Sequence, residues 1–160
     1  MIRRSLVLLL SLFYLNSCQS VKYLGKEKIN TYAFRLKPGQ DLKQSIVEFV
    51  EKNQIKAGWI AATVGSLTRY NIRFANRDSG SVSEGHFEII SCSGLLSVEG
   101  SHLHLSLADS NGVVIGGHML DGCIVYTTAE IVIQSTNAYR FSREKDGSTP
   151  YKELKVVELN

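Results

Sequence analysis

Three of the four histidines of this 160-residue chain lie close together in the sequence. His102 and His104 are two residues apart, and His118 follows after an Asp-Ser-Asn-Gly turn signal at residues 109–112. Neutral imidazole is a common zinc ligand, and three imidazoles leave a fourth coordination position open for water or a ligand. The spacing therefore makes His102, His104 and His118 candidate zinc ligands. The alternative is a metal-free set of hydrogen-bonded side chains on a sheet face that another subunit covers.

Whether the three histidines meet depends on one residue of strand register. Residues 102–108, His-Leu-His-Leu-Ser-Leu-Ala, alternate as a half-buried strand, which places His102 and His104 on one face and the leucines on the other. If residues 110–112 form a three-residue turn with Gly112 in the left-handed conformation, His118 lies directly opposite His104. A turn of two or four residues would place His118 on the other face.

Four further residues could belong to the same patch. Gly116 and Gly117 precede His118 and indicate either a close approach of another backbone or a ligand, or else a simple bulge. Thr128 and Glu130 lie on the following predicted strand and could reach the histidines, with Glu130 as a candidate general base. A solvated or salt-bridged carboxylate is the more common role for such a glutamate. The sequence contains no nucleophile elbow, phosphate-binding glycine loop or paired-cysteine knuckle, so no motif indicates an enzyme.

The N-terminus has the pattern of an export signal. Arg3 and Arg4 precede a ten-residue apolar run at 6–15, which is too short to span a bilayer, and Cys18 follows at once. We predict a signal peptide over 1–17, lipidation of Cys18, a tether over 18–29 and a folded domain over 30–160. Gln19 after the cysteine resembles Gram-negative sorting signals for the outer membrane, so we expect a lipoprotein on its periplasmic side. An ordinary secretory signal or an uncleaved anchor are the alternatives.

Composition limits the partners and the redox chemistry. Removing two of the 18 basic residues with the signal leaves 16 against 15 acidic ones, a net charge of about +1. A domain this close to neutral has no electrostatic footprint for nucleic acid, so no nucleic-acid partner is expected. Cys92 and Cys123 remain in the folded part, and we predict free buried thiols rather than a disulfide.

The elements that must position the histidines form an α+β domain. Asp41 and Gln44 make a capping-box pattern at the start of a helix over 41–53, and its apolar residues recur at helical spacing. The remaining pattern is strand-like, with a bulge at Gly94. The predicted strands are 30–37, 58–66, 67–76, 85–97, 101–108, 113–120, 122–134, 137–143 and 154–159. We therefore predict a mostly antiparallel sheet with the helix packed on one face.

Residues 100–133 resemble the core of the plants and prokaryotes conserved (PPC) domain, also called the domain of unknown function 296. The pairing of His-x-His with Gly-Gly-His at this spacing carries the resemblance, and residues 85–89, Gly-His-Phe-Glu-Ile, resemble the segment Gly-Arg-Phe-Glu-Ile of plant members. The similarity spans roughly residues 30–143.

The resemblance implies a homotrimer with a metal site near the subunit interface, and by motif its ligands here are His102, His104 and His118. In plants the domain follows an AT-hook that binds DNA, but this chain has no Arg-Gly-Arg-Pro hook. We therefore predict a lipid-anchored, homotrimeric binding module whose histidine patch holds zinc or a small ligand. A DNA-binding regulator and a zinc-dependent, hydrolase-like enzyme are the alternatives.

Overall fold

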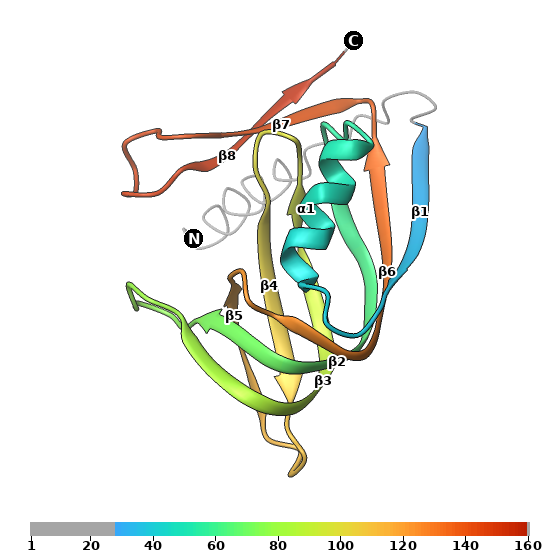
Figure 1. Ribbon diagram of the computed structural model, residues 1–160. Helices are drawn as coiled ribbons and strands as arrows, with labels where there is room; N and C mark the ends of the chain where they lie inside the picture. Colours follow the sequence, from blue (N-terminus) through green and yellow to red (C-terminus); the bar gives the residue numbers. More distant parts are fainter. Residues whose placement is uncertain (1–27, 160) are drawn as a thin grey trace, which may run out of the picture.

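The computed structural model describes residues 28–159, which form one helix and eight strands (Figure 1). In chain order they are β1 (Ile29–Leu36), α1 (Leu42–Lys52), β2 (Gly58–Arg73), β3 (Ser81–Leu96), β4 (His102–Ala108), β5 (Val114–Met119), β6 (Ile124–Thr136), β7 (Tyr139–Glu144) and β8 (Glu153–Glu158). The predicted antiparallel α+β fold is confirmed. The predicted signal peptide, Cys18 and nearly all of the tether lie outside the described residues. Within residues 28–159, no helix is long and apolar enough to cross a membrane.

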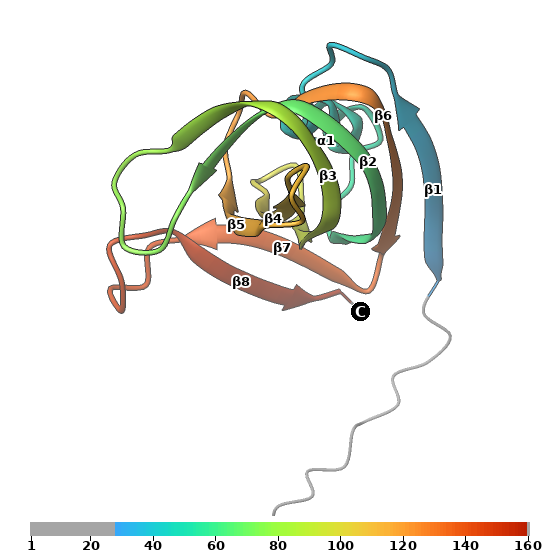
Figure 2. The ribbon, with the colours of Figure 1, turned by 90° about the horizontal axis from the view of Figure 1, so that it is seen from below.

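Six strands form one curled antiparallel sheet in the order β1-β6-β2-β3-β4-β5. The end of β2 also pairs with β5, with Ile72 opposite Met119 and Arg73 opposite His118. Figure 2 shows β2 and β3 arching around β4 and β5. Because the sheet curls, a central strand and an edge strand of the same sheet contribute to one site.

The prediction of two strands over 58–66 and 67–76 was wrong, because β2 is continuous. Its register against β6 shifts on both sides of Leu67, and Gly65 has a φ of +140°. Such irregularities bend a strand without reversing its direction. They also change which side chains face the core, so the alternating pattern in the sequence is interrupted as it would be at a turn. The predicted bulge at Gly94 was also misplaced. The register shifts between Ile89 and Ser91, whereas Gly94 lets the β3 backbone approach β4 closely.

The helix α1 packs on the inner face of the sheet as predicted. The Asp41 carboxylate caps it by accepting a hydrogen bond from the Gln44 backbone N–H at 3.1 Å. Leu42, Ile46 and Val50 are buried in the core. Cys92 and Cys123 belong to the same core as free thiols, which confirms that prediction. Burial raises the pKa of Cys92 to about 12 and that of Cys123 to about 11.

A separate hairpin of β7 and β8 follows the main sheet. The Phe141 N–H donates to the Lys56 carbonyl at 2.9 Å, and Arg140 forms an ion pair with Glu99 at 2.7 Å. These contacts attach the hairpin beside the loop that leads into β4, and Figures 1 and 2 show the ribbon crossing next to β4. The hairpin therefore lies close to the first histidine.

Candidate metal centre

Strand β4 presents its two histidines outward because its leucines are buried. Leu103, Leu105 and Leu107 have exposed fractions of 0–1%, whereas His102 and His104 are exposed. A slip of one residue would expose all three leucines and bury both histidines, so the hydrophobic core fixes the face. The predicted assignment of the two faces is confirmed.

The turn between β4 and β5 has the three-residue form that the sequence left open. The Asp109 N–H donates to the Val113 carbonyl at 3.1 Å, and Gly112 has a φ of +76°. The Asp109 carboxylate also accepts hydrogen bonds from the N–H groups of Asn111 at 2.8 Å and Val113 at 2.9 Å. This turn sets the register that pairs His104 with His118.

The three histidines converge. The Nε2 atoms of His102 and His104 are 3.2 Å apart, and one candidate nitrogen from each ring lies within 4.8 Å of the others. Zinc–nitrogen distances of about 2.0 Å in a tetrahedral site separate two ligand nitrogens by roughly 3.3 Å. The spacing of His102 and His104 fits this value, and a small closure would bring His118 into the same shell.

Burial and nearby positive charge lower the pKa of two of the three rings, His102 and His118. Burial and then the neighbouring His102 and Arg73 lower the pKa of His118 to about 4. Burial and then Arg143 lower the pKa of His102. Neutral imidazoles offer the lone pairs that a metal needs. In addition, Nδ1 of His118 is buried with no hydrogen-bond partner among residues 28–159. The donor set therefore fits a zinc ion.

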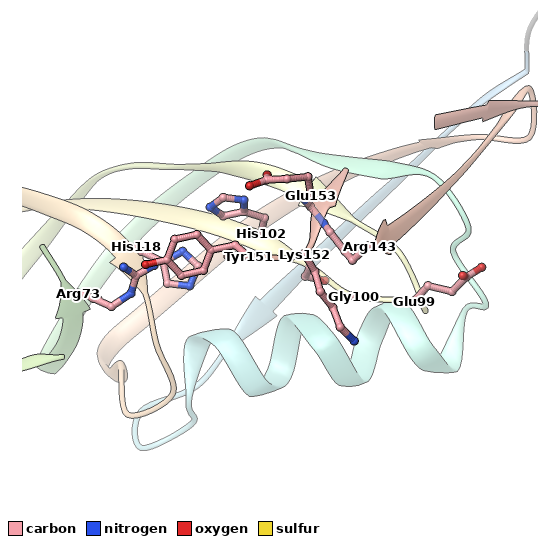
Figure 3. Close-up of a pocket in the computed structure, with 10 residues that line it drawn as sticks. Arg73, Glu99, Gly100, His102, His118, Arg143, Tyr151, Lys152 and Glu153 are labelled. Carbon is pink, nitrogen blue, oxygen red and sulfur yellow. The ribbon is translucent and has the colours of Figure 1, made fainter. Parts of the chain in front are cut away.

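A depression of about 480 Å³ opens beside the cluster (Figure 3). Its floor includes Arg73, His102 and His118 from the main sheet. The β7–β8 hairpin supplies four residues to its other side: Arg143, Tyr151, Lys152 and Glu153. The position next to the histidines is thus accessible to a small molecule and is partly covered by the hairpin.

The other predicted site residues lie apart from the ring nitrogens or serve packing. Glu130 stands on β6 between Arg35 of β1 and Val64 of β2, and lines a different depression. Thr128 precedes Ala129, which pairs with Gly65. Neither residue is among those that line the two depressions beside the histidines. The structure therefore does not bring Glu130 and Thr128 to the cluster.

Gly116 and Gly117 confirm the predicted close approach of another backbone. A Cβ atom at Gly117 would lie 2.7 Å from the Arg73 carbonyl oxygen, and one at Gly116 would lie 2.9 Å from the Leu105 carbonyl oxygen. These glycines let β5 fit between β4 and the end of β2. They position His118 and do not line the depression.

Sequence reasoning missed Arg73, Arg143 and Tyr151. Arg73 joins the site only because β2 curls back onto β5. Arg143 and Tyr151 join it through the C-terminal hairpin. No local pattern marks these residues, since each is brought in by long-range pairing.

Comparison with known sequences gives a consistent match. The Plants and Prokaryotes Conserved (PCC) domain matches residues 23–137. The bifunctional protein GlmU of Synechococcus sp. (strain JA-3-3Ab) is 42% identical over 131 residues, which is 82% of this chain and 21% of that protein. The AT-hook motif nuclear-localized protein 8 of Arabidopsis thaliana is 26% identical over 113 residues, or 65% of this chain and 29% of that protein. The chain thus spans about a fifth to under a third of these curated relatives.

Solved structures match nearly along their full length. A hypothetical protein of Salmonella enterica has a TM-score of 0.80 and 41% identity, covering 83% of this chain and 96% of that one. A metal-containing protein of Archaeoglobus fulgidus has a TM-score of 0.68 and 24% identity, covering 84% and 97%. A putative DNA-binding protein of Bacteroides thetaiotaomicron has a TM-score of 0.69 and 18% identity, covering 81% and 96%. The last two likenesses show the fold alone.

Proposed function

The chain belongs to the Plants and Prokaryotes Conserved domain family, and on this premise we propose that it is a binding module that holds one zinc ion on His102, His104 and His118. The observation that carries the proposal is the convergence of three imidazole nitrogens within 4.8 Å. The name of the Archaeoglobus relative, a metal-containing protein, agrees with it. Zinc is the preferred ion because an all-imidazole set suits its tetrahedral coordination.

Three protein ligands leave one position of the zinc ion for water or an external ligand. When bound, zinc supplies a Lewis-acidic centre at that position. The residues of this chain set the approach to it, because the depression beside His102 and His118 is the way in. With Glu130 on another part of the sheet, binding is a better account of the site than hydrolysis.

Metal content tests the proposal directly. The full chain is purified without an affinity tag in mild detergent, dialysed against zinc and measured by elemental analysis. We expect about one zinc per chain, and an affinity at least about a hundredfold weaker in His104→Ala, because that variant lacks one of the three protein ligands of the metal.

The fourth histidine gives a matched control. His86 lies exposed on β3 and stacks on Tyr126, outside the cluster, so His86→Ala should retain the zinc. A wild-type chain that binds no zinc would overturn the proposal. Equal losses in the two variants would overturn the ligand assignment.

DNA binding is the second candidate, because two similar structures are named putative DNA-binding proteins and one relative has an AT-hook in its name. These names run against the expectation of no nucleic-acid partner. A nearly neutral domain would bind duplex DNA only weakly through phosphate contacts. Titration with a labelled duplex at low and high salt decides between the two: salt-dependent binding supports this candidate, and no binding at low salt excludes it.

We also propose export and lipidation at Cys18, on the pattern of residues 1–20. The mature chain would then be an outer-membrane lipoprotein facing the periplasm. Metabolic labelling with palmitate should mark the wild-type chain and not a Cys18→Ala variant, whereas labelling of that variant would refute the proposal.

A further inference from the structure

Positive charge without an ion-pair partner surrounds the open side of the histidine cluster. Arg73, Arg143 and Lys152 all line the depression. Within residues 28–159 no carboxylate forms an ion pair with any of them, since the three ion pairs found there join Lys43 to Asp121, Arg140 to Glu99 and Lys155 to Glu144. Both arginines are half-buried, where an unpaired charge is costly.

Two carboxylates also line the depression, and the charge of Glu153 acts on Arg143 without forming an ion pair with it. Glu99 is paired with Arg140, and Glu153 accepts a hydrogen bond from the Thr149 hydroxyl. Three cationic side chains against these two carboxylates leave the lining with an excess of positive charge even before a metal binds.

The two arginines flank the histidines from opposite sides. Arg73 pairs with His118 across β2 and β5, and its guanidinium lies 5.8 Å from the centre of the Tyr151 ring. Arg143 lines the depression beside His102 and also the smaller one that His102 shares with His104. Figure 3 shows Arg73 and Tyr151 on the His118 side and Arg143 on the His102 side. A divalent cation on the histidines would be repelled by both guanidinium groups unless an anion lay between them.

We propose that this depression binds a small organic carboxylate, whose carboxylate group lies between the open position of the metal and the guanidinium groups of Arg143 and Arg73. The inference rests on the proposed zinc site. Carboxylate oxygen is a normal zinc ligand, and guanidinium recognises carboxylate through paired hydrogen bonds. The volume of about 480 Å³ suits a molecule of metabolite size, with Tyr151 as an aromatic wall for its body.

Two consequences follow from this arrangement. The carboxylate offsets the repulsion between the metal ion and the two guanidinium groups, so metal and carboxylate bind cooperatively. Each raises the affinity for the other by the same factor. The choice of ligand depends on the hairpin that carries Arg143 and Tyr151, which lies beyond the residues 23–137 matched by the family.

Cobalt(II) in place of zinc makes the fourth ligand visible. The full chain in mild detergent is loaded with cobalt(II) and titrated with benzoate while the visible absorption is recorded. We expect a saturable change in the cobalt bands and a cobalt affinity that rises with benzoate. Benzyl alcohol, of similar shape but uncharged, should leave both unchanged.

Variants then identify the residues. Arg143→Gln and Arg73→Gln should each weaken benzoate binding roughly tenfold or more, the worth of a charge-assisted hydrogen bond. Arg35→Gln removes an exposed arginine of β1 that lies outside the depression, and should have no effect. Circular dichroism verifies that each variant is folded.

The outcomes separate the two proposals. Cobalt binding without a response to benzoate would overturn the carboxylate site and leave the metal site standing. A response that Arg35→Gln weakens as much as the other two variants would also overturn it, as a general charge effect. No cobalt binding by the wild-type chain would overturn the metal site and with it this inference.

Discussion

At the scale of a residue, His118 links the site to pH. Its pKa in the folded chain is about 4, whereas an unfolded histidine titrates near 6.5. Between these values the unfolded chain binds more protons, so the free energy of unfolding is fully retained above pH 6.5 and falls as the pH drops toward 4. We expect the metal-free protein to lose roughly 1–2 kcal/mol of stability across this window, after allowance for the partial exposure of the ring.

Urea denaturation in EDTA at several pH values measures this loss. His118→Gln removes the titrating ring, so its stability should vary less between pH 6.5 and 4 than that of the wild type. His86→Gln, outside the cluster, should retain the wild-type slope. Identical slopes in wild type and His118→Gln would show that His118 is not the group responsible.

At the scale of an element, the β4–β5 turn determines whether the three imidazoles meet. The Asp109 carboxylate holds two turn N–H groups. Asp109→Ala should therefore lower the free energy of unfolding, because two turn N–H groups lose their acceptor. It should also weaken zinc binding, since His118 is positioned by the register that this turn sets. Thermal denaturation and zinc titration check both effects.

Ser110→Ala is the matched control for that variant. Ser110 is exposed in the same turn, so its replacement should change neither stability nor affinity. If Asp109→Ala bound zinc as tightly as the wild type, the core leucines of β4 and the glycines of β5 would be enough to hold the register.

At the scale of the whole molecule, we propose the homotrimer that membership of the family suggests. Apolar side chains are exposed on the strands of the main sheet, including Val64 at 57%, Ile90 at 55% and Tyr126 at 41%. Surfaces of this kind mark contacts between proteins. The chain in detergent should sediment as a species of three chains, and Ile90→Asp should shift it toward the monomer. A monomeric wild-type chain would contradict the proposal.

Local sequence determined the parts of the site that depend on local structure. The leucines of β4 predicted which face the histidines take, and Asn111-Gly112 allowed the turn that pairs His104 with His118. The pairing of strands that are distant in the sequence could not be predicted in this way. Glu130 was only a candidate to reach the histidines, because β6 follows β5 in the chain, but β6 pairs with β1 and β2 instead. Chain order therefore predicted the hairpin of β4 and β5 correctly. It did not predict that β6 lies between β1 and β2.

The charged side of the site shows the same limit. Arg73 reaches His118 through the curl of a 16-residue strand that the sequence divided into two. Arg143 and Tyr151 arrive on a hairpin that has no pairing partner in the main sheet. Side-chain alternation contains no information on either arrangement, because both depend on how distant strands close the molecule.

The pairing of β2 with β5 has a consequence for how the sheet meets other chains. An unpaired edge strand can accept a strand from a neighbour and so begin aggregation. The end of β5 is closed off because Met119 and His118 are already paired with β2. Among residues 28–159, β1 is then the full-length open edge of the six-stranded sheet. Arg35 on β1 and Lys37 just after it are exposed charged residues, which discourage the addition of another strand. The histidines lie at the other edge, where the end of β5 is already paired with β2.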